Sequence, residues 1–447
     1  MNLSKKQILL VSFMLFSLFF GAGNLIFPPF LGQMAGENTP IAIATFLLTA
    51  VVLPVLGVIV VAKFNGLEKL ANRVSPKFAI IFTILIYVSI GPGLGIPRAA
   101  SVPFEMAVAP YLPKGTSLGI CMLLYSAVFF SIATWLALNP TKLVERIGKV
   151  LTPSLLILII FLFVSFLVNG QVKVTDPQPS YAANPAVVGF LEGYNTMDAI
   201  AALNFGLVIS LTIKNFGVKE DKSVMKYTTM CGIFAGTILS LIYLVLSYLG
   251  MSSSGVYPIH DNGAWTLRYI VHDLFGETGA ILLIAIFTLA CLTTCVGLIT
   301  SISQYFSTLI KKVSYRQFVL MISVFAFVVC NQGLSTILNI SVPVLNSIYP
   351  IAIVLVLLGL FDKHLKDNPY VYPVTVFFVG VVSIYFSLEN LGISWAPLSG
   401  LFHKLPFYSM GIGWSLVALV CVFVSVLFNK LSTRQVSACE DIQTEDC

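Results

Sequence analysis

Two apolar stretches of the chain carry glycine and polar residues where a buried helix normally has neither. They are "FFGAGNLIFPPF" at 19–30 and "VVGFLEGYNTMDAIAALNFG" at 187–206. A break in a helix leaves the last carbonyls of one half and the first amides of the next without helical partners. Carbonyls attract a cation or an ammonium group, whereas amides at the positive end of a helix attract a carboxylate. The two breaks therefore predict a binding site for a zwitterion such as an amino acid.

The residues at the two breaks are the predicted substrate-binding residues. We expect a carboxylate to face the amides of residues 23–25, and an ammonium group or a monovalent cation to face the carbonyls that end the preceding half-helices. Either break alone is better explained by close packing of membrane helices, but two breaks at matching positions favour binding. The predicted set is Gly21, Ala22, Gly23, Asn24, Gly193, Tyr194, Asn195 and Thr196.

Three charged residues are predicted to act in gating or coupling. Arg98 lies within an apolar segment, where a charge is costly and indicates a function by default. Glu105 is seven residues further on, along nearly the same helical face, so the two form either a structural ion pair or part of a gate. Asp198 either caps and supports the second half-helix, which we favour, or carries a coupling proton as a buried carboxyl can.

Membrane helices must position these residues. The chain of 447 residues is 57% hydrophobic and 10% charged, against roughly 25% charged residues in a soluble domain. Runs such as "LLILIIFLFVSFLV" do not alternate as the strands of a membrane barrel do, so the predicted fold class is all-α and polytopic. About twelve spans of the length that crosses a bilayer are expected, at 8–32, 40–62, 78–104, 118–138, 150–169, 184–213, 227–251, 278–309, 317–332, 339–361, 371–390 and 408–428.

Lysine and arginine are distributed unevenly between the loops. If the N-terminus is cytoplasmic, the segments on that side hold 20 of the 25, as the positive-inside rule requires. We therefore expect a protein of the cell (inner or plasma) membrane with both termini in the cytoplasm. The same distribution accounts for the net charge of +6, so no nucleic-acid partner is expected. The breaks fall in the first and sixth spans, which enter the membrane from opposite sides, an arrangement typical of secondary transporters.

Three stretches resemble the signatures of a known family. "FGAGNLIFPP" at 20–29, "GPGLGIPRAASVPFE" at 91–105 and "GYNTMDAIAALNFG" at 193–206 are similar to those of the branched-chain amino acid:cation symporters. The resemblance implies the five-plus-five inverted-repeat fold of the bacterial leucine transporter, with helices 1 and 6 broken. The implied parts are a first repeat at 1–170, a second repeat at 171–361, two further spans at 362–430 and a disordered cytoplasmic tail at 431–447.

The resemblance also implies a cation site. Sodium-coupled members of the wider fold hold the ion between carbonyls of the first span and a small residue plus two hydroxyls of the eighth. The matching residues here are Ser17 and Phe20 in the first span, with Ala290, Thr293 and Thr294 in "LACLTTC" at 289–295. Oxygen ligands suit a hard cation, although buried threonines also bond back to their own helix. Sodium is the favoured coupling ion and a proton the alternative; no organic cofactor is expected.

The predicted function is import of leucine, isoleucine and valine by alternating access, driven by a sodium or proton gradient. The alternative is a symporter of the same fold for another small neutral amino acid or a nucleobase. An enzyme would need a catalytic set within the spans, where we find none, and a channel would need a continuous polar pore. The expected partners are the small-molecule substrate and the lipid bilayer, with no obligatory protein partner.

Overall fold

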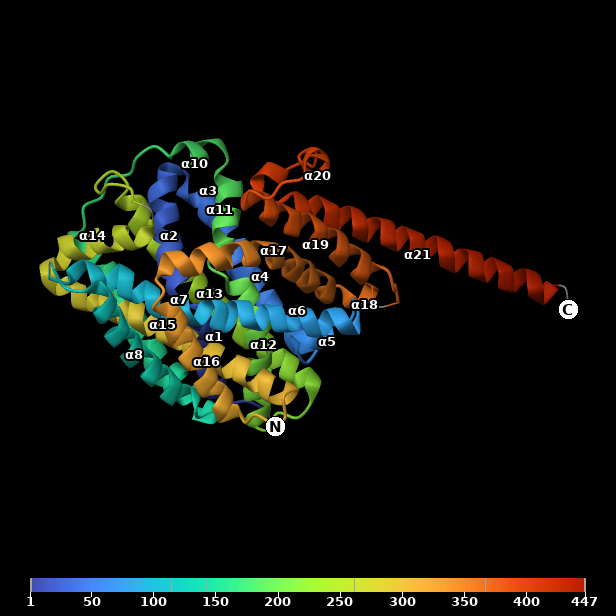
Figure 1. Ribbon diagram of the computed structural model, residues 1–447, viewed down its shortest axis with the longest axis horizontal. Coiled ribbons are helices and arrows are strands. Elements are labelled where there is room, and N and C mark those ends of the chain that lie inside the picture. The colour runs from blue at the N-terminus through green and yellow to red at the C-terminus, as the bar shows by residue number, and fades with distance from the viewer. Residues whose placement is uncertain (1, 114, 143, 261, 366, 446–447) are drawn as a thin grey trace. The chain divides into compact units, whose positions relative to one another are not determined.

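The computed structural model describes residues 2–113, 115–142, 144–260, 262–365 and 367–445. Within these ranges the regular elements are helices (Figure 1). The chain divides into two compact units, Met1–Gly66 with Tyr87–Leu338, and Leu67–Ile86 with Asn339–Cys447. One of the three boundaries falls just before α5 (Leu67–Ala71), and the other two fall inside helices α6 (Pro76–Val88) and α17 (Leu334–Leu360).

The first unit contains the helices that carry both breaks. These helices and their neighbours are α1 (Lys5–Phe19), α2 (Ala22–Ala35), α3 (Thr39–Leu47), α4 (Leu53–Lys63), α7 (Gly95–Pro103), α8 (Leu118–Ala137), α9 (Thr152–Asn169), α10 (Pro179–Ala183), α11 (Pro185–Tyr194), α12 (Asp198–Asn215), α13 (Asp221–Ser252), α14 (Gly263–Phe275), α15 (Gly279–Leu309) and α16 (Tyr315–Cys330). Helices α13 and α15 each contact α1, α2 and α12. The two long helices thus hold the broken ones together.

The prediction of a polytopic all-α membrane protein is confirmed. Within the described residues, nine helical segments are long and apolar enough to cross a membrane, or ten if the bent pair α11 and α12 counts as one span. Short 3-10 and π turns keep some neighbouring spans in one helical run, such as Ala22–Lys63, which contains the part of the first predicted span after its break and all of the second. The count of twelve spans stays a prediction.

The first break lies at Phe20 and Gly21, between α1 and α2. Gly21 has an extended backbone and precedes the first residue of α2, and its N–H donates a 2.9 Å hydrogen bond to Asn24 Oδ1. Asn24 does not begin the second half-helix but lies in the first turn of a helix that already starts at Ala22. The physical reason is this hydrogen bond, which gives a helix-end amide a side-chain partner and so stabilises the earlier start.

The second break lies at 195–197, between α11 and α12, whose axes differ by 43°. Met197 has a left-handed backbone with φ of 66°, a conformation that a residue with a side chain seldom adopts. The hydroxyl of Thr196 donates a 2.8 Å hydrogen bond to the carbonyl of Gly193, one of the carbonyls left free at the end of α11. The break thus falls where the sequence predicts it.

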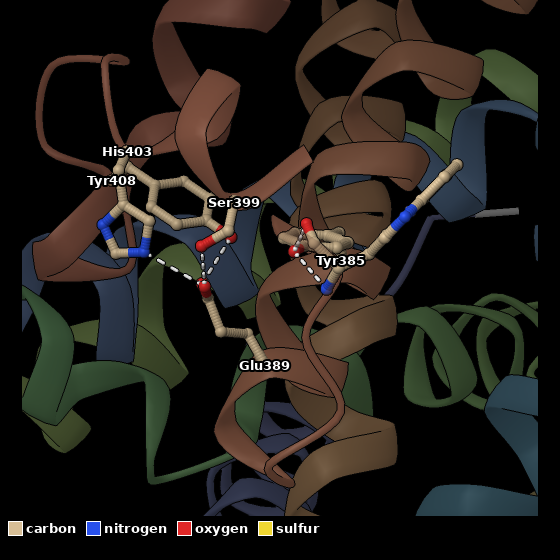
Figure 2. Close-up of polar contacts among 6 residues, drawn as sticks. Tyr385, Glu389, Ser399, His403 and Tyr408 are labelled. Atoms are coloured by element: carbon tan, nitrogen blue, oxygen red, sulfur yellow. Dashed lines mark hydrogen bonds and ion pairs between the residues drawn. The ribbon is translucent and has the colours of Figure 1, made fainter. Parts of the chain in front are cut away.

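The second unit contains α5 (Leu67–Ala71), α18 (Asp362–Leu365), α19 (Val371–Asn390), α20 (Ala396–Phe402) and α21 (Gly413–Glu445). Helices α19 and α21 pack side by side. Figure 2 shows how the segment between them is held: the carboxylate of Glu389 accepts hydrogen bonds from Ser399 Oγ at 2.6 Å, His403 Nε2 at 3.0 Å and Tyr408 Oη at 3.0 Å. One carboxylate at the end of α19 therefore fixes α20 and the turn after it.

The backbone of the predicted disordered tail is helical in the structure. Helix α21 continues through that segment to Glu445, and residues 446 and 447 lie outside the described part of the chain. The segment 431–445 contains neither glycine nor proline, so nothing in its backbone chemistry stops a helix that has already formed. Disorder of the tail in solution stays a prediction.

Candidate functional site

Both breaks line one cavity in the first unit. Its volume is about 50 Å³, and it is enclosed by four parts of the chain: the first break, α7 with the turn before it, the second break and α15. The lining residues are Phe19, Gly21, Ala22, Gly23, Asn24, Ile90, Gly95, Arg98, Ala99, Thr196, Met197, Asp198, Ala201, Cys291, Thr294 and Leu298. Five of the eight predicted substrate-binding residues are among them, namely Gly21, Ala22, Gly23, Asn24 and Thr196.

The other three predicted residues lie on α11 or just after it, and none of them lines this cavity. Gly193 packs against the neighbouring span, since a Cβ placed on it would lie 1.8 Å from Thr49 Oγ1. Tyr194 packs against the ring of Phe190, and Asn195 Nδ2 donates to Glu192 at 3.1 Å. For Gly193 the geometry is that of close helix packing, and a role for these three in substrate binding stays a prediction.

A buried hydrogen-bond network joins the two breaks. Asn24 Nδ2 donates to Asp198 Oδ2 at 2.6 Å and also bonds to the hydroxyl of Tyr243, which in turn donates to Asp198 Oδ2 at 2.9 Å. Asn24 and Asp198 are 1% and 2% exposed, and Tyr243 is fully buried. Asp198 lies in the first turn of α12, whose positive end favours a carboxylate. Its side chain makes its hydrogen bonds across the site rather than capping its own helix.

Arg98 brings a positive charge to the start of α2. It lies on α7, which begins after a kink where Gly91 leaves the helical conformation. A Cβ placed on Gly23 would be 3.1 Å from Arg98 Nη2, and Arg98 Nη1 lies 3.5 Å from the sulfur of Met197. The guanidinium therefore lies between the two breaks, where it also interacts electrostatically with Asp198.

Glu105, the predicted partner of Arg98, lies one element further on. It belongs to the π-helical turn Phe104–Val108, which follows the end of α7 at Pro103. It is not among the residues that line the cavity, whereas Arg98 and Asp198 are. The expected pairing of Arg98 with Glu105 stays a prediction.

Four oxygen atoms from α1 and α15 converge beside the first break. Thr293 Oγ1 donates to the carbonyls of Ser17 and Ala290, both at 2.9 Å, and Thr294 Oγ1 lies 3.3 and 3.4 Å from the same two carbonyls. The threonines thus bond both to their own helix and across to α1. A set of neutral oxygens is of the kind that a hard cation takes as ligands. Phe20, the fifth predicted residue, ends α1 with its side chain buried.

Tyr243 and Met197 belong to the site but were not predicted from the sequence. Tyr243 sits in "LIYLVLSYLG" on α13, a few residues before Tyr248, which packs against a phenylalanine ring. No property of the local sequence distinguishes the tyrosine that bonds to Asp198 from the one that does not. Met197 directly follows the polar residues of the second break, and this position could have indicated that it belongs to the site.

The fold has counterparts among solved structures. It matches the structure of Mhp1, a nucleobase-cation-symport-1 family transporter in a closed conformation with bromovinylhydantoin bound, with a TM-score of 0.59 at 13% identity over 95% of this chain and 93% of the other. It also matches MhsT in complex with L-phenylalanine, with a TM-score of 0.52 at 15% identity over 95% of this chain and 98% of the other. The fold is therefore leucine-transporter-like, and the site lies at its broken helices.

Sequence comparison places the chain more narrowly. Residues 4–432 match the family described as branched-chain amino acid transport protein, and the chain belongs to this family. It is 41% identical over 424 residues to the branched-chain amino acid permease BraB of Bacillus subtilis, covering 94% of each chain. It is 40% identical over 436 residues to the branched-chain amino acid transport system 2 carrier protein of Pseudomonas aeruginosa, covering 96% of this chain and 98% of the relative. The protein is a multi-pass membrane transporter and not an enzyme.

Proposed function

We propose that the protein is a symporter that imports leucine, isoleucine and valine across the cell membrane, coupled to sodium and with both termini in the cytoplasm. The observation that carries the proposal is the meeting of both broken helices at one cavity, with a cationic and an anionic side chain on its walls and a cluster of oxygens beside it. The names of the curated relatives support the substrate class. The uneven distribution of lysine and arginine supports the orientation.

The carboxylate of the substrate binds at Arg98 in this proposal. The guanidinium lies at the start of α2, so two positive features, the arginine and the helix end, meet at Gly23. Such a place favours an anion. The ammonium group binds at Asp198, which lines the same cavity. A substrate with both charges, and without a charge on its side chain, complements these two groups.

The rest of the cavity is suited to an aliphatic side chain. Its remaining walls are mainly apolar, including Phe19, Ile90, Met197 and Leu298. One methylene in such a pocket changes the binding free energy by only roughly 1–3 kcal/mol. The protein should therefore accept leucine, isoleucine and valine and discriminate only modestly among them.

Substrate binding requires the helices to move apart. A cavity of about 50 Å³ has room for a few water molecules but not for leucine. In the proposed cycle the site opens to one side, accepts substrate and cation, closes around them, and then opens to the other side. The bend between α11 and α12 and the break between α1 and α2 are the places where such movement costs least, because the helical hydrogen bonds are already interrupted there.

Sodium binds beside the substrate in this proposal. The carbonyls of Ser17 and Ala290 and the hydroxyls of Thr293 and Thr294 supply oxygens, with the hydroxyl hydrogens turned away from the ion. Thr294 also packs against the first break, since a Cβ on Gly21 would lie 3.1 Å from its Oγ1. Sodium would thus order the segment that binds the substrate, and by reciprocity the substrate raises the affinity for sodium.

Uptake into proteoliposomes tests the proposal. Labelled leucine should accumulate when a sodium gradient is imposed, and a proton gradient alone should have little effect. Unlabelled isoleucine and valine should compete, whereas a hydantoin or a nucleobase, which lacks the amino acid zwitterion, should not. Uptake that is indifferent to both gradients would disprove symport. Uptake driven by a proton gradient alone would show that the proton, and not sodium, is the coupling ion. Competition by nucleobases alone would support the alternative substrate class.

A further inference from the structure

A groove lies between α8 and α16, away from the substrate cavity. Its volume is about 430 Å³. Its lining combines small residues, Ala127, Ser131 and Ser323, with the large rings of Phe130, Trp135 and Phe327. The two helices pack against each other but leave this space unfilled.

The groove opens on the apolar outer surface of the first unit. Trp135 is 59% exposed and Val324 on α16 is 61% exposed. Exposed apolar residues continue along both helices, including Val128 on α8 and Phe325 on α16. In a membrane protein such a surface faces lipid, so the molecules that reach the groove are those of the bilayer.

One end of the groove is basic. Arg146 stacks on Trp135, with its Cζ 4.3 Å from the ring centroid, and its Nη1 donates to the last carbonyls of α8, at Trp135 and Leu136. Among the residues that the structure describes, the side-chain hydrogen bonds of Arg146 both use Nη1, so Nη2 and Nε can bind a phosphate. The arginine is thus held at the rim of the groove by neutral groups, the indole ring and two carbonyls.

Further cations lie at the same end. The end of α8 and the start of α16 are adjacent, because Tyr315 Oη donates a 2.6 Å hydrogen bond to the carbonyl of Ala137. The two chain segments that meet there, 138–151 and 310–316, contain six basic residues and one acidic residue, Glu145. Basic pockets between membrane helices are the usual sites for anionic lipid headgroups.

We propose that this groove binds an anionic phospholipid, with one acyl chain between α8 and α16 and the phosphate on Arg146. The apolar hollow accounts for the chain, and the stacked arginine accounts for the charge. A zwitterionic phospholipid would fill the same groove but would gain less from the basic end. The site is separate from the substrate cavity, so the proposal does not depend on the transported substrate.

Native mass spectrometry of the full-length protein with added dioleoyl phosphatidylglycerol or dioleoyl phosphatidylcholine tests the proposal. The wild type should retain phosphatidylglycerol about fivefold more tightly, the effect of roughly one basic residue near a lipid phosphate. Arg146→Gln should remove this preference and Arg146→Lys should keep it. Ser131→Leu, which fills the groove, should weaken retention of both lipids.

Two variants serve as matched controls. Ser154, like Ser131, is exposed and bonds back to the carbonyl four residues earlier, so Ser154→Leu should leave lipid retention unchanged. Lys226→Gln removes an exposed cation elsewhere and should leave the preference unchanged. Equal retention of the two lipids by the wild type, or the same effect from Ser131→Leu and Ser154→Leu, would overturn the proposal.

Discussion

Asn24 and Asp198 are joined by a 2.6 Å hydrogen bond, although they are 174 residues apart in the sequence. Each lies in the first turn of the helix that follows a break. Asn24 also accepts the N–H of Gly21, so one side chain links both breaks. If one broken span moves relative to the other, the hydrogen bond between Asn24 and Asp198 must break. A ligand that binds Asp198 in place of Asn24 therefore favours this movement.

Tyr243→Phe tests the contribution of this network. The variant removes one donor from the Asp198 carboxylate, and a hydrogen bond to a charged group contributes about 1.5–3 kcal/mol. We therefore expect initial rates of leucine uptake in proteoliposomes to fall by about 10-fold or more, at an unchanged yield of folded protein. The matched control is Tyr248→Phe on the same helix, whose ring packs against Phe163 at 6.0 Å between centroids. Equal losses in both variants would show that packing of α13, and not the network, limits transport.

The sequence predicted the breaks well because their signals are local. Glycine and polar residues inside an apolar run can be recognised without knowing what surrounds them, and both breaks lie within a residue or two of their expected places. The meeting of Ser17 with Thr293 and Thr294 was predicted through the family resemblance, since nothing in either segment alone indicates the other. The leucine-transporter-like arrangement was predicted in the same way, whereas the all-α membrane class followed from composition and apolar runs.

The partners of the buried polar residues could not be predicted, because they depend on contacts between distant helices. Gly23 and Gly193 occur in similar contexts, yet one faces Arg98 and the other faces Thr49. Likewise, the structure places Arg98 beside the second break, 99 residues away at Met197, a neighbour that spacing along its own helix does not indicate. Spacing predicts which residues share a helical face, but not what that face meets.

Asp198→Asn separates the two roles considered for this carboxylate. If Asp198 binds the substrate ammonium, the neutral amide should raise the KM for leucine about 10-fold or more, while uptake keeps its dependence on the sodium gradient. If Asp198 carries a coupling proton, the variant should instead lose any acceleration by an imposed proton gradient. Measuring uptake under each gradient separately decides between them, and an unchanged KM would remove the ammonium role.

Arg98→Gln tests the proposed carboxylate site. Loss of the guanidinium should raise the KM for leucine about 10-fold or more, since a charged hydrogen bond is lost. Inhibition by leucinamide, which has no carboxylate, should change little. Glu105→Gln provides the comparison: it should leave the KM for leucine unchanged if Arg98 serves the substrate. An equal effect of the two variants would instead support the Arg98–Glu105 pair expected from the sequence.

Thr293→Val and Thr294→Val test the cation site. Each variant replaces a hydroxyl with a methyl group of similar size, so the helix should fold while one oxygen is lost from the cluster with Ser17. We expect the sodium concentration for half-maximal uptake to rise about 10-fold in each, since a lost charged contact contributes more than 1 kcal/mol. Thr300→Val, at a buried position further along the same helix, is the matched control and should leave it unchanged. If the sodium concentration for half-maximal uptake is unchanged in both variants, the ion binds elsewhere.

Gly23→Ala and Gly193→Ala should fail in different ways, because the two glycines have different surroundings. A Cβ on Gly23 would lie 3.1 Å from Arg98 Nη2 and 3.2 Å from Phe27 Cε2, both ends of side chains that can shift, and 3.3 Å from the Cα of Thr196 in the second break. We therefore expect Gly23→Ala to reach the membrane at a normal level but to lose most leucine uptake.

A Cβ on Gly193 would lie 1.8 Å from Thr49 Oγ1 and 2.8 Å from the carbonyl of Phe46. Relieving that contact requires α11 to separate from α3, so Gly193→Ala should lower the amount of folded protein. Gly119→Ala, with nothing within 4 Å, should change neither quantity. Size-exclusion profiles of the solubilised protein, measured beside uptake, distinguish the two outcomes. If Gly193→Ala gives a normal profile but loses uptake, the result would support the substrate-binding role that the sequence predicted for Gly193.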